Sequence, residues 1–436
     1  KRRILNREEV ESMNPNDETC GDRKPLPMSQ CALRSRNPIR EIVDNLVIPT
    51  PPEDKPLILL SIGDPTKFGN LKTPQIFVDA ICEAVRDFSS HGYTHSAGIP
   101  AARAAVAQRY SYGGSKLVED DVIIASGCSG ALEIAIKALA SEGDNMLVPC
   151  PGFSLYQTLM ESNNISAKPY NLLPDQNWEI DLKSLEDAIN EKTRAIVINN
   201  PSNPCGSVFN KQHLLQILGV AERHNLPILA DEIYGGIIFK GSKFWPIASL
   251  TNTVPVLSVG GIAKEFLVPG FRVGWILCYD NNRHDLSEVW KGALKLTQLI
   301  IGANTVVQPA LKTILTPQPG SKDAKTLEAF HYETSKQLEK NANFVADTLV
   351  KVHGLKVIRP QGAMYSMIGI DTSVFDDSIS DDVAFSQKLM DEEFVFVLPG
   401  QCFGMNNYFR LVLSPPIKKL EEACSRIAAF CEKHRL

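Results

Sequence analysis

The sequence predicts an α/β protein with a large domain, built on a mostly parallel mixed β-sheet flanked by helices, and a smaller α+β domain. The chain has 436 residues, 44% of them hydrophobic, which is more than one ordinary core accommodates. Short β-rich runs alternate with helical stretches through the middle of the chain, a pattern typical of a parallel sheet. The last hundred or so residues instead open with a long charged helix followed by short strands, which favours an α+β unit.

The expected boundaries follow from these composition changes. Residues 1–36 lack apolar periodicity and are rich in Asp, Glu, Asn and Pro, so we expect a flexible N-terminal arm. We assign residues 71–330 to the large domain, and residues 37–70 together with 331–436 to the small domain.

Each element is expected where its residue pattern is strongest. The expected strands of the large domain are apolar and β-branched runs at Val122–Ala125, Asn145–Val148, Arg194–Asn199, Leu226–Ala230, Val254–Ser258 and Val273–Cys278. Helices are expected between them at Ser129–Ala140 and Lys211–His224. The small domain should contain helices over Ala324–Val352 and Ile417–His434 and strands near Leu355–Ile358, Met364–Ile370 and Tyr408–Leu413.

Charge and cysteine usage exclude several classes of partner. Lys plus Arg number 45 against 50 for Asp plus Glu, so no basic excess draws the chain to nucleic acid or to a membrane surface. No run approaches the ~20 apolar residues that span a bilayer. The ten cysteines form no CxxC pair, so we expect free thiols in a reducing compartment. The expected location is the cytoplasm, with the mitochondrion as the alternative.

Polar residues follow several of the expected strands, at the edge where open parallel sheets bind ligands. The strand Val122–Ala125 runs into a Gly-bearing turn, Ser126–Gly130, that opens a helix. Free N–H groups and the positive end of the helix dipole make such a turn a weak indication of a phosphate site. Taken alone, the stretch is better explained as an ordinary strand–helix turn.

Three further stretches are harder to dismiss. Asn199–Gly206, Asp231–Tyr234 and Gly260–Lys264 each follow an expected strand, and Arg272 lies eight residues after Lys264. Asx-Pro turns, helix caps and solvated lysines would explain each stretch by itself. Their occurrence in this order, each after a strand, favours a shared site.

These stretches resemble the class I aminotransferases, a family of fold-type I enzymes that depend on pyridoxal 5'-phosphate (PLP). Gly261–Gly274 fits the family's lysine signature at every constrained position. Asn199–Gly206 resembles its Asn-Pro-x-Asn-Pro-x-Gly turn, with Cys205 where Thr is more usual, and Asp231–Tyr234 resembles its cofactor-ring motif. The likeness covers roughly residues 37–436. It implies the fold-type I architecture, PLP as cofactor, and a homodimer with active sites at the subunit interface.

The resemblance implies roles around the cofactor ring. Lys264 would carry the cofactor and then move a proton at the substrate Cα. Asp231 would pair with the pyridine nitrogen and keep it protonated. Asn203 and Tyr234 would hydrogen-bond the phenolic oxygen of the ring, and Phe153 would stack on its face.

The resemblance also implies the groups that hold the phosphate and the substrate carboxylate. The N–H groups of Cys128 and Ser129, the Ser129 hydroxyl and Arg272 would bind the phosphate. Tyr93 would reach the phosphate of the neighbouring subunit. Arg410 would clamp the substrate α-carboxylate through its planar fork. Gly63 would let the chain approach that carboxylate closely, beside Asn203.

The implied reaction is a ping-pong transfer of the amino group of an L-amino acid to a 2-oxo acid. Tyrosine or another aromatic donor is expected, because several stretches resemble the branch of the family that acts on tyrosine: Asn37–Arg40, Ser61–Thr66, Pro149–Tyr156, Gly362–Tyr365 and Glu421–Arg426. Enzyme alternatives are an alanine or kynurenine transaminase or a cysteine-conjugate β-lyase. The non-enzyme alternative is a PLP-sensing regulator, which the short acidic arm and the negative net charge disfavour.

Two departures from the family pattern affect these expectations. Many relatives carry Ser three residues before the lysine, where this chain has Gly261, so a hydroxyl contact to the phosphate would be lost. Aspartate-specific relatives place an arginine in the segment that matches Thr297–Thr305, and none occurs there. The sequence therefore does not indicate how an acidic oxo acid would be recognised.

Other chemistries lack support, and no metal is expected. His91 and His95 have the spacing of a helical metal pair, but Gly92 and the surrounding turn residues argue against a helix. The chain has neither a G-x-G-x-x-G dinucleotide fingerprint nor a G-x-S-x-G nucleophile elbow.

Overall fold

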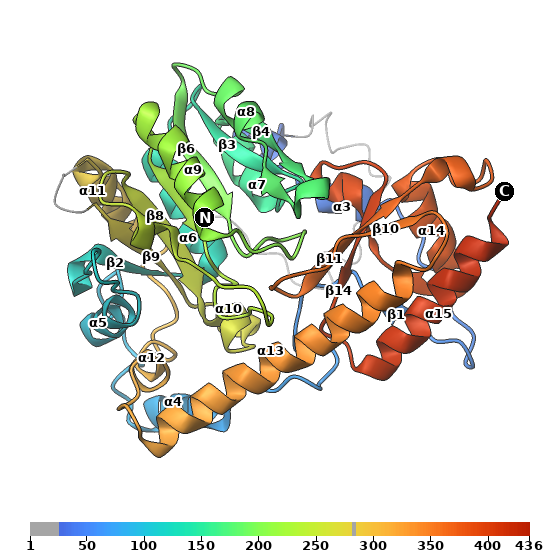
Figure 1. Ribbon diagram of the computed structural model, residues 1–436. Coiled ribbons are helices and arrows are strands. Elements are labelled where there is room, and N and C mark those ends of the chain that lie inside the picture. Colours follow the sequence, from blue (N-terminus) through green and yellow to red (C-terminus); the bar gives the residue numbers. More distant parts are fainter. Residues whose placement is uncertain (1–25, 281–284) are drawn as a thin grey trace, which may run out of the picture.

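The computed structural model describes residues 26–280 and 285–436, which form a larger and a smaller domain, each with its own sheet (Figure 1). Residues 1–25 of the expected arm lie outside the described residues. The rest of that segment contains the short helix α2 (Gln30–Arg34), whose N-cap Ser29 accepts a 3.2 Å hydrogen bond from Ala32 N.

The large sheet has eight strands in the order β2-β9-β8-β7-β6-β3-β4-β5. Strands β3, β4, β6, β7 and β8 run parallel, β9 lies antiparallel between β2 and β8, and β5 is antiparallel to β4 at the edge. The bounds are β2 (Val122–Ala125), β3 (Asn145–Cys150), β4 (Ser166–Leu173), β5 (Glu179–Ile180), β6 (Thr193–Asn199), β7 (Ile228–Asp231), β8 (Val256–Gly261) and β9 (Gly274–Tyr279). The six strands expected from the sequence are confirmed within three residues at each end, and β4 and β5 were not anticipated.

Helices cover both faces of this sheet, because successive side chains of a strand point to opposite faces. In β6, Ala195 and Val197 pack with one group of helices, whereas Ile196 and Ile198 pack with the other. The first group is α6 (Gly127–Leu139), α7 (Leu155–Ser162) and α11 (Ser287–Leu296). The second is α5 (Pro100–Arg109), α9 (Lys211–Arg223) and α12 (Ala310–Leu315).

The small domain is built on an antiparallel sheet in the order β10-β11-β14-β13. Its bounds are β10 (Leu355–Val357), β11 (Tyr365–Ile370), β13 (Leu398–Pro399) and β14 (Tyr408–Val412), with α14 (Asp382–Glu393) and α15 (Ile417–Lys433) packed beside it. A separate parallel pair, β1 (Ile58–Leu59) with β12 (Val395–Phe396), brings the early part of the chain to this domain. Four further helices are α3 (Pro38–Val43), α4 (Gln75–Arg86), α8 (Leu182–Asp187) and α10 (Ile262–Glu265).

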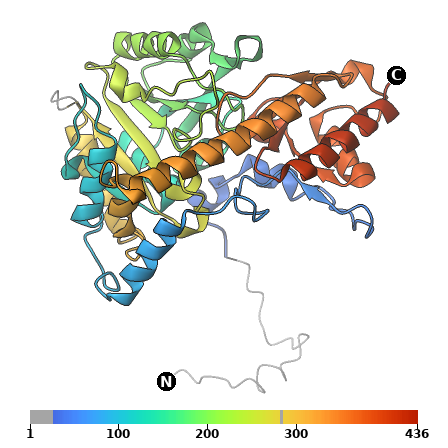
Figure 2. The same cartoon turned by 60° about the horizontal axis from the view of Figure 1, so that its bottom comes forward.

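The 28-residue helix α13 (Lys322–Leu349) connects the two domains and corresponds to the long helix expected from the sequence. Its N-terminal end lies near α4 and α12, and its other end lies beside α15 (Figures 1 and 2). Leu327 belongs to a cluster of the large sheet, whereas Leu338 and Val345 belong to that of the small sheet. Within the described ranges, no helix has both the length and the apolar character needed to cross a membrane.

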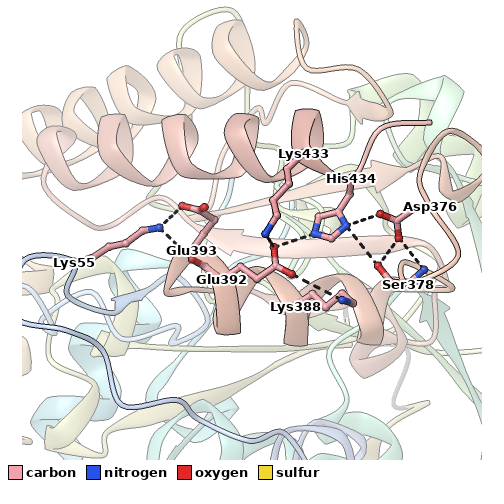
Figure 3. A network of polar contacts seen from close by, with 8 residues as sticks. All are labelled: Lys55, Asp376, Ser378, Lys388, Glu392, Glu393, Lys433 and His434. Atoms are coloured by element: carbon pink, nitrogen blue, oxygen red, sulfur yellow. Dashed lines mark hydrogen bonds and ion pairs between the residues drawn. The ribbon is translucent and has the colours of Figure 1, made fainter.

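A network of charged side chains anchors the C-terminal end of α15 (Figure 3). Both ring nitrogens of His434 contact carboxylates: Nδ1 lies 2.7 Å from Asp376 Oδ2, and Nε2 lies 2.9 Å from Glu392 Oε2. Lys433 Nζ is 2.8 Å from the same Glu392 oxygen. The imidazole ring therefore bridges a carboxylate of α14 and a carboxylate of the loop that precedes it.

Candidate active site

A cavity of about 400 Å³ lies between the carboxyl edge of the large sheet and the small sheet. Ten of the residues singled out in the sequence line it: Gly63, Cys128, Ser129, Phe153, Asn203, Asp231, Tyr234, Lys264, Arg272 and Arg410. The exception is Tyr93, which is 92% exposed and does not line this cavity.

The sheet explains why residues so distant in sequence meet. Parallel strands β6, β7 and β8 are neighbours, so the residues that follow them emerge at one edge. Asn199, the last residue of β6, is paired in register with Asp231, the last residue of β7. The short helix α10 then begins directly after β8 and carries Lys264 to the same edge.

Lys264 offers a primary amine to the cavity. Its Nζ donates a 2.6 Å hydrogen bond to the backbone carbonyl of Gly63, which belongs to the segment that precedes the large domain in sequence. This partner is neutral, so no described carboxylate neutralises the amine. The amine is therefore available for covalent chemistry or proton transfer.

Asp231 is a buried carboxylate, only 3% exposed. Burial raises its pKa, and hydrogen bonds oppose this shift, above all the one from Tyr156 Oη at 2.7 Å. Ile233 N and Cys128 Sγ also donate to it, at 3.3 and 3.7 Å. None of these donors is a cation, so the carboxylate can accept a proton-bearing ring nitrogen from the cavity.

The N-terminus of α6 and Arg272 form an anion-binding corner. Gly127 has φ +70°, and a Cβ there would lie 2.6 Å from Arg272 Nη2. Arg272 donates to two backbone carbonyls, those of Pro269 at 3.0 Å and Ser126 at 3.2 Å, and has no acidic partner among the described residues. A cation without a counter-ion beside the first N–H groups of a 13-residue helix is suited to a phosphate.

Arg410 forms the opposite end of the cavity. It extends from β14, is only 4% exposed, and has neutral partners: Asn203 Oδ1 at 3.0 Å from Nη1 and the Ser61 carbonyl at 2.8 Å from Nη2. Its Nε is buried and has no partner. Burial lowers its pKa, as expected for a cation without a counter-ion. The group therefore suits a ligand carboxylate.

Two tyrosines meet between these ends. Tyr234 Oη lies 2.8 Å from Tyr365 Oη, and burial raises the pKa of Tyr234 well above its usual range. Gly63 faces the same hydroxyl, because a Cβ at position 63 would lie 2.5 Å from Tyr365 Oη. The chain therefore needs glycine at this position for packing reasons.

Comparison with known proteins identifies the family. The profile described as "Aminotransferase class I and II" matches residues 55–427. The chain belongs to this family of aminotransferases. Tyrosine aminotransferase of Bos taurus is 47% identical over 94% of this chain and 89% of its own length, and that of Dictyostelium discoideum is 45% identical over 93% and 96%.

Solved structures agree with the fold-type I architecture. Tyrosine aminotransferase from Leishmania infantum superimposes with a TM-score of 0.87 at 35% identity, covering 95% of this chain and 100% of that one. Alanine aminotransferase from Pyrococcus furiosus gives 0.85 at 28% identity, covering 94% and 100%. The mostly parallel mixed sheet of the large domain and the smaller α+β domain expected from the sequence are thereby confirmed.

Aminotransferases of this family use PLP, and the cavity of this aminotransferase is suited to that molecule. It presents three groups that PLP requires and that lack a charged partner among the described residues: the amine of Lys264, the carboxylate of Asp231 and the guanidinium of Arg272. The group of three or more His, Cys, Asp or Glu side chains that a metal ion needs does not occur in ranges 26–280 and 285–436.

Sequence reasoning missed two residues of this aminotransferase site. Tyr156 bonds the carboxylate of Asp231, and Tyr365 bonds Tyr234. Both lie in stretches that resembled the family, Pro149–Tyr156 and Gly362–Tyr365, so the signal was available. Nothing in the sequence alone indicated which atom either hydroxyl would meet.

The glycine that replaces serine in the lysine signature has a packing reason. Gly261 is paired with Gly274 across β8 and β9, and a Cβ at position 261 would lie 2.9 Å from Gly274 Cα and from Val273 O. Both contacts are backbone atoms, which cannot rotate away. In this chain a serine at position 261 would require β9 to shift.

Proposed function

We propose that this aminotransferase binds PLP and transfers the amino group of L-tyrosine, or another aromatic L-amino acid, to a 2-oxo acid by a ping-pong reaction. The supporting observation is that one cavity offers the Lys264 amine, the buried Asp231 carboxylate and the Arg410 guanidinium with a free Nε. The aromatic preference is supported by the tyrosine aminotransferases at 47% identity. It is also supported by the cavity's apolar walls, formed by Ile39, Ile62, Leu132, Phe153 and Leu398.

When bound, PLP supplies an aldehyde that condenses with amines and a ring that accepts an electron pair. Lys264 holds the cofactor covalently and, once released, moves a proton at the substrate Cα with Nζ. Asp231 holds the proton of the pyridine nitrogen. Phe153, which lines the cavity, would stack on the ring face.

Asn203 and Tyr234 hydrogen-bond the phenolic oxygen of the ring. Asn203 Oδ1 already accepts from Arg410, so its amide NH₂ is the end left to donate. The N–H groups of Cys128 and Ser129, the Ser129 hydroxyl and Arg272 would hold the phosphate.

Arg410 binds the substrate α-carboxylate through Nε and the remaining N–H groups of its fork. Gly63 permits close approach to this carboxylate, since a side chain there would collide with Tyr365. Asn203 positions the guanidinium of Arg410 by accepting a hydrogen bond from its Nη1.

We also propose a homodimer in which Tyr93 reaches the phosphate of the neighbouring subunit. Large hydrophobic side chains are exposed in its own segment and in residues 299–301: Phe88 (72%), Leu299 (72%), Ile300 (56%) and Ile301 (58%). Two hydrogen bonds of 2.7 Å, Ser96 Oγ to Thr297 Oγ1 and Thr305 Oγ1 to Ser90 O, tie their two segments together. An apolar patch of this kind favours a protein interface.

Mixing inactive variants tests this dimer. Lys264→Ala subunits, which keep Tyr93, combined with Tyr93→Ala subunits, which keep Lys264, should form hybrids with one intact site and regain activity. A monomeric mass in light scattering, or no regain after the subunits exchange, contradicts the interface.

The domain division that we propose places residues 71–330 in the large domain and 37–70 with 331–436 in the small one, preceded by the arm 1–36. We further propose a cytoplasmic location, which is supported by the free thiols of the described cysteines.

A donor and acceptor panel tests the activity. Tyrosine with 2-oxoglutarate, pyruvate or oxaloacetate should yield 4-hydroxyphenylpyruvate, and borohydride should leave a pyridoxyl group on Lys264. Lys264→Ala should lose both, whereas the exposed-lysine control Lys240→Ala should keep both. Faster turnover of alanine or kynurenine, or pyruvate and ammonia from a cysteine conjugate, would favour the alternative specificities. A wild-type protein that stays colourless with PLP would overturn the proposal.

A further inference from the structure

The guanidinium of Arg410 lies between two aromatic rings. Its central carbon is 4.4 Å from the ring centroid of Tyr365 and 4.7 Å from that of Phe403. Among the described residues its hydrogen-bond partners are an amide oxygen and a backbone carbonyl, and no carboxylate binds it. The two rings therefore fix the plane of the fork that must meet a carboxylate edge-on.

Tyr365 also contacts Tyr234, the residue proposed to bind the phenolic oxygen of the cofactor ring. Its Oη lies 2.8 Å from Tyr234 Oη, and the two rings meet edge to face, with centroids 5.6 Å apart. On its other side, the Tyr365 hydroxyl leaves no room for a side chain at Gly63. Tyr365 is 2% exposed, so the surrounding side chains hold its ring in place.

The number of available protons decides which of the two hydroxyls donates. Each phenol carries one proton, so one of the two hydroxyls donates to the other. If Tyr234 directs its proton to the ring oxygen of PLP, as proposed above, it must accept from Tyr365. A hydroxyl that accepts a hydrogen bond becomes a stronger donor, because chained hydrogen bonds polarise one another.

We propose that Tyr365 is a positioning residue that couples the two ends of the site. Its ring orients Arg410 for the substrate carboxylate, and its hydroxyl donates to Tyr234 and strengthens the bond from Tyr234 to the cofactor's ring oxygen. This inference rests on the proposed function. A purely structural role for Tyr365, as a buried side chain of β11, would change stability and leave both ends of the site unaltered.

The hydroxyl is tested with Tyr365→Phe, which keeps the ring and so the packing. The pH midpoint of the visible absorption of the PLP-loaded protein reports how well negative charge on the ring oxygen is stabilised. Loss of one donor in the chain should move this midpoint upward by roughly 0.3–1 pH unit. Tyr408→Phe, a partly buried tyrosine of the same small sheet outside the cavity lining, is the matched control and should not move it.

A double-mutant cycle separates this route from a general effect. If Tyr365 acts through Tyr234, the midpoint of Tyr234→Phe/Tyr365→Phe should equal that of Tyr234→Phe. Additive shifts contradict the coupling. An absent visible band in the wild-type chain would overturn the proposed function as well, whereas a normal wild-type band with an unshifted Tyr365→Phe midpoint overturns this inference alone.

The ring is tested with Tyr365→Leu and the unreactive carboxylate 3-phenylpropionate. Removing a desolvated cation–π contact should weaken binding by roughly 5- to 30-fold, while Tyr365→Phe stays within about twofold of the wild type. Equal affinity in all three proteins refutes the orienting role. Phe403→Leu removes the opposite ring and should weaken binding comparably, so the test remains decisive if Tyr365→Leu does not fold.

Discussion

Replacing Gly261 by serine distinguishes the packing explanation for this glycine from the loss of a phosphate contact. Many relatives carry serine here, so family analogy predicts that Gly261→Ser restores a hydroxyl contact and tightens PLP binding. The structure predicts the opposite. The backbone of Gly261 is extended, with φ 165°, so a side chain causes no torsional strain, and the decisive factor is space.

The magnitude follows from the contacts. The new Cβ would lie 2.9 Å from two backbone atoms of residues 273 and 274, so β9 must move by several tenths of an ångström. Overpacking of this kind costs about 1–3 kcal/mol. For a chain of 436 residues that corresponds to a Tm lower by roughly 1–3 °C. Gly274 is itself packed against Cys128 N, so the shift also deforms the proposed phosphate corner.

Thermal unfolding without PLP measures the destabilisation caused by overpacking alone, because a hydrogen bond from the serine hydroxyl to the phosphate exists only when PLP is bound. PLP affinity is then measured by titration of the visible band. Gly113→Ser is the matched control, since a Cβ at position 113 meets nothing within 4 Å. A Gly261→Ser protein as stable as the wild type that binds PLP more tightly would refute the reasoning.

Three further substitutions test the site and the C-terminal network. Tyr156→Phe removes the hydroxyl that opposes the raised pKa of Asp231, so the acid limb of the pH–rate profile should move to higher pH and kcat/KM should fall roughly 10-fold. Arg410→Lys loses the planar fork and should raise KM for the amino acid about 10- to 100-fold, with a smaller change in kcat. His434→Gln should lower Tm at neutral pH, and this difference should shrink between about pH 4 and pH 2. That range follows because hydrogen bonds from Ser378 and His434 hold the pKa of Asp376 at about 2, so its stabilisation exists above its usual pKa and is lost as pH falls through 2.

Each of these expectations has a contrary result. An unmoved acid limb in Tyr156→Phe would mean that the hydroxyl does not act on Asp231. A fall in kcat without a change in KM would remove Arg410 from substrate binding. A Tm difference for His434→Gln that persists at pH 2 would show that the histidine contributes by packing against Phe430, from which its ring centroid is 4.7 Å away, rather than by charge.

The sequence was most informative where a strand or a charged side chain follows from local pattern. The apolar run of β2 is buried throughout and that of β6 is buried except at Arg194, and both strands were predicted nearly to the residue. Strand β4 was missed because Ser166–Leu173 mixes Ser, Lys, Pro and Asn with apolar residues, as befits a strand near the sheet edge. The two-residue strands β1 and β12 have no detectable pattern and exist only through their pairing.

The site divides in the same way. Lys264, Asp231 and Arg272 could be predicted because each belongs to a stretch that resembles a motif of the family. Contacts that join different strands through side chains, such as Tyr156 to Asp231, depend on rotamers and on the angle of a helix. These are set by tertiary packing, and a linear pattern does not contain them.

The continuous helix α13 has a consequence for attempts to divide this molecule. Its first turns pack against one core and its later turns against the other, with Phe330 in contact with both. The boundary between the two domains therefore lies within a continuous helix about 42 Å long and not in a flexible linker. Cleavage by a protease, or division of the gene, within α13 would expose apolar side chains of the core on each side of the cut. Neither half would then be stable by itself. Grafting a new small domain onto this scaffold would have to retain this helix and exchange only what surrounds it.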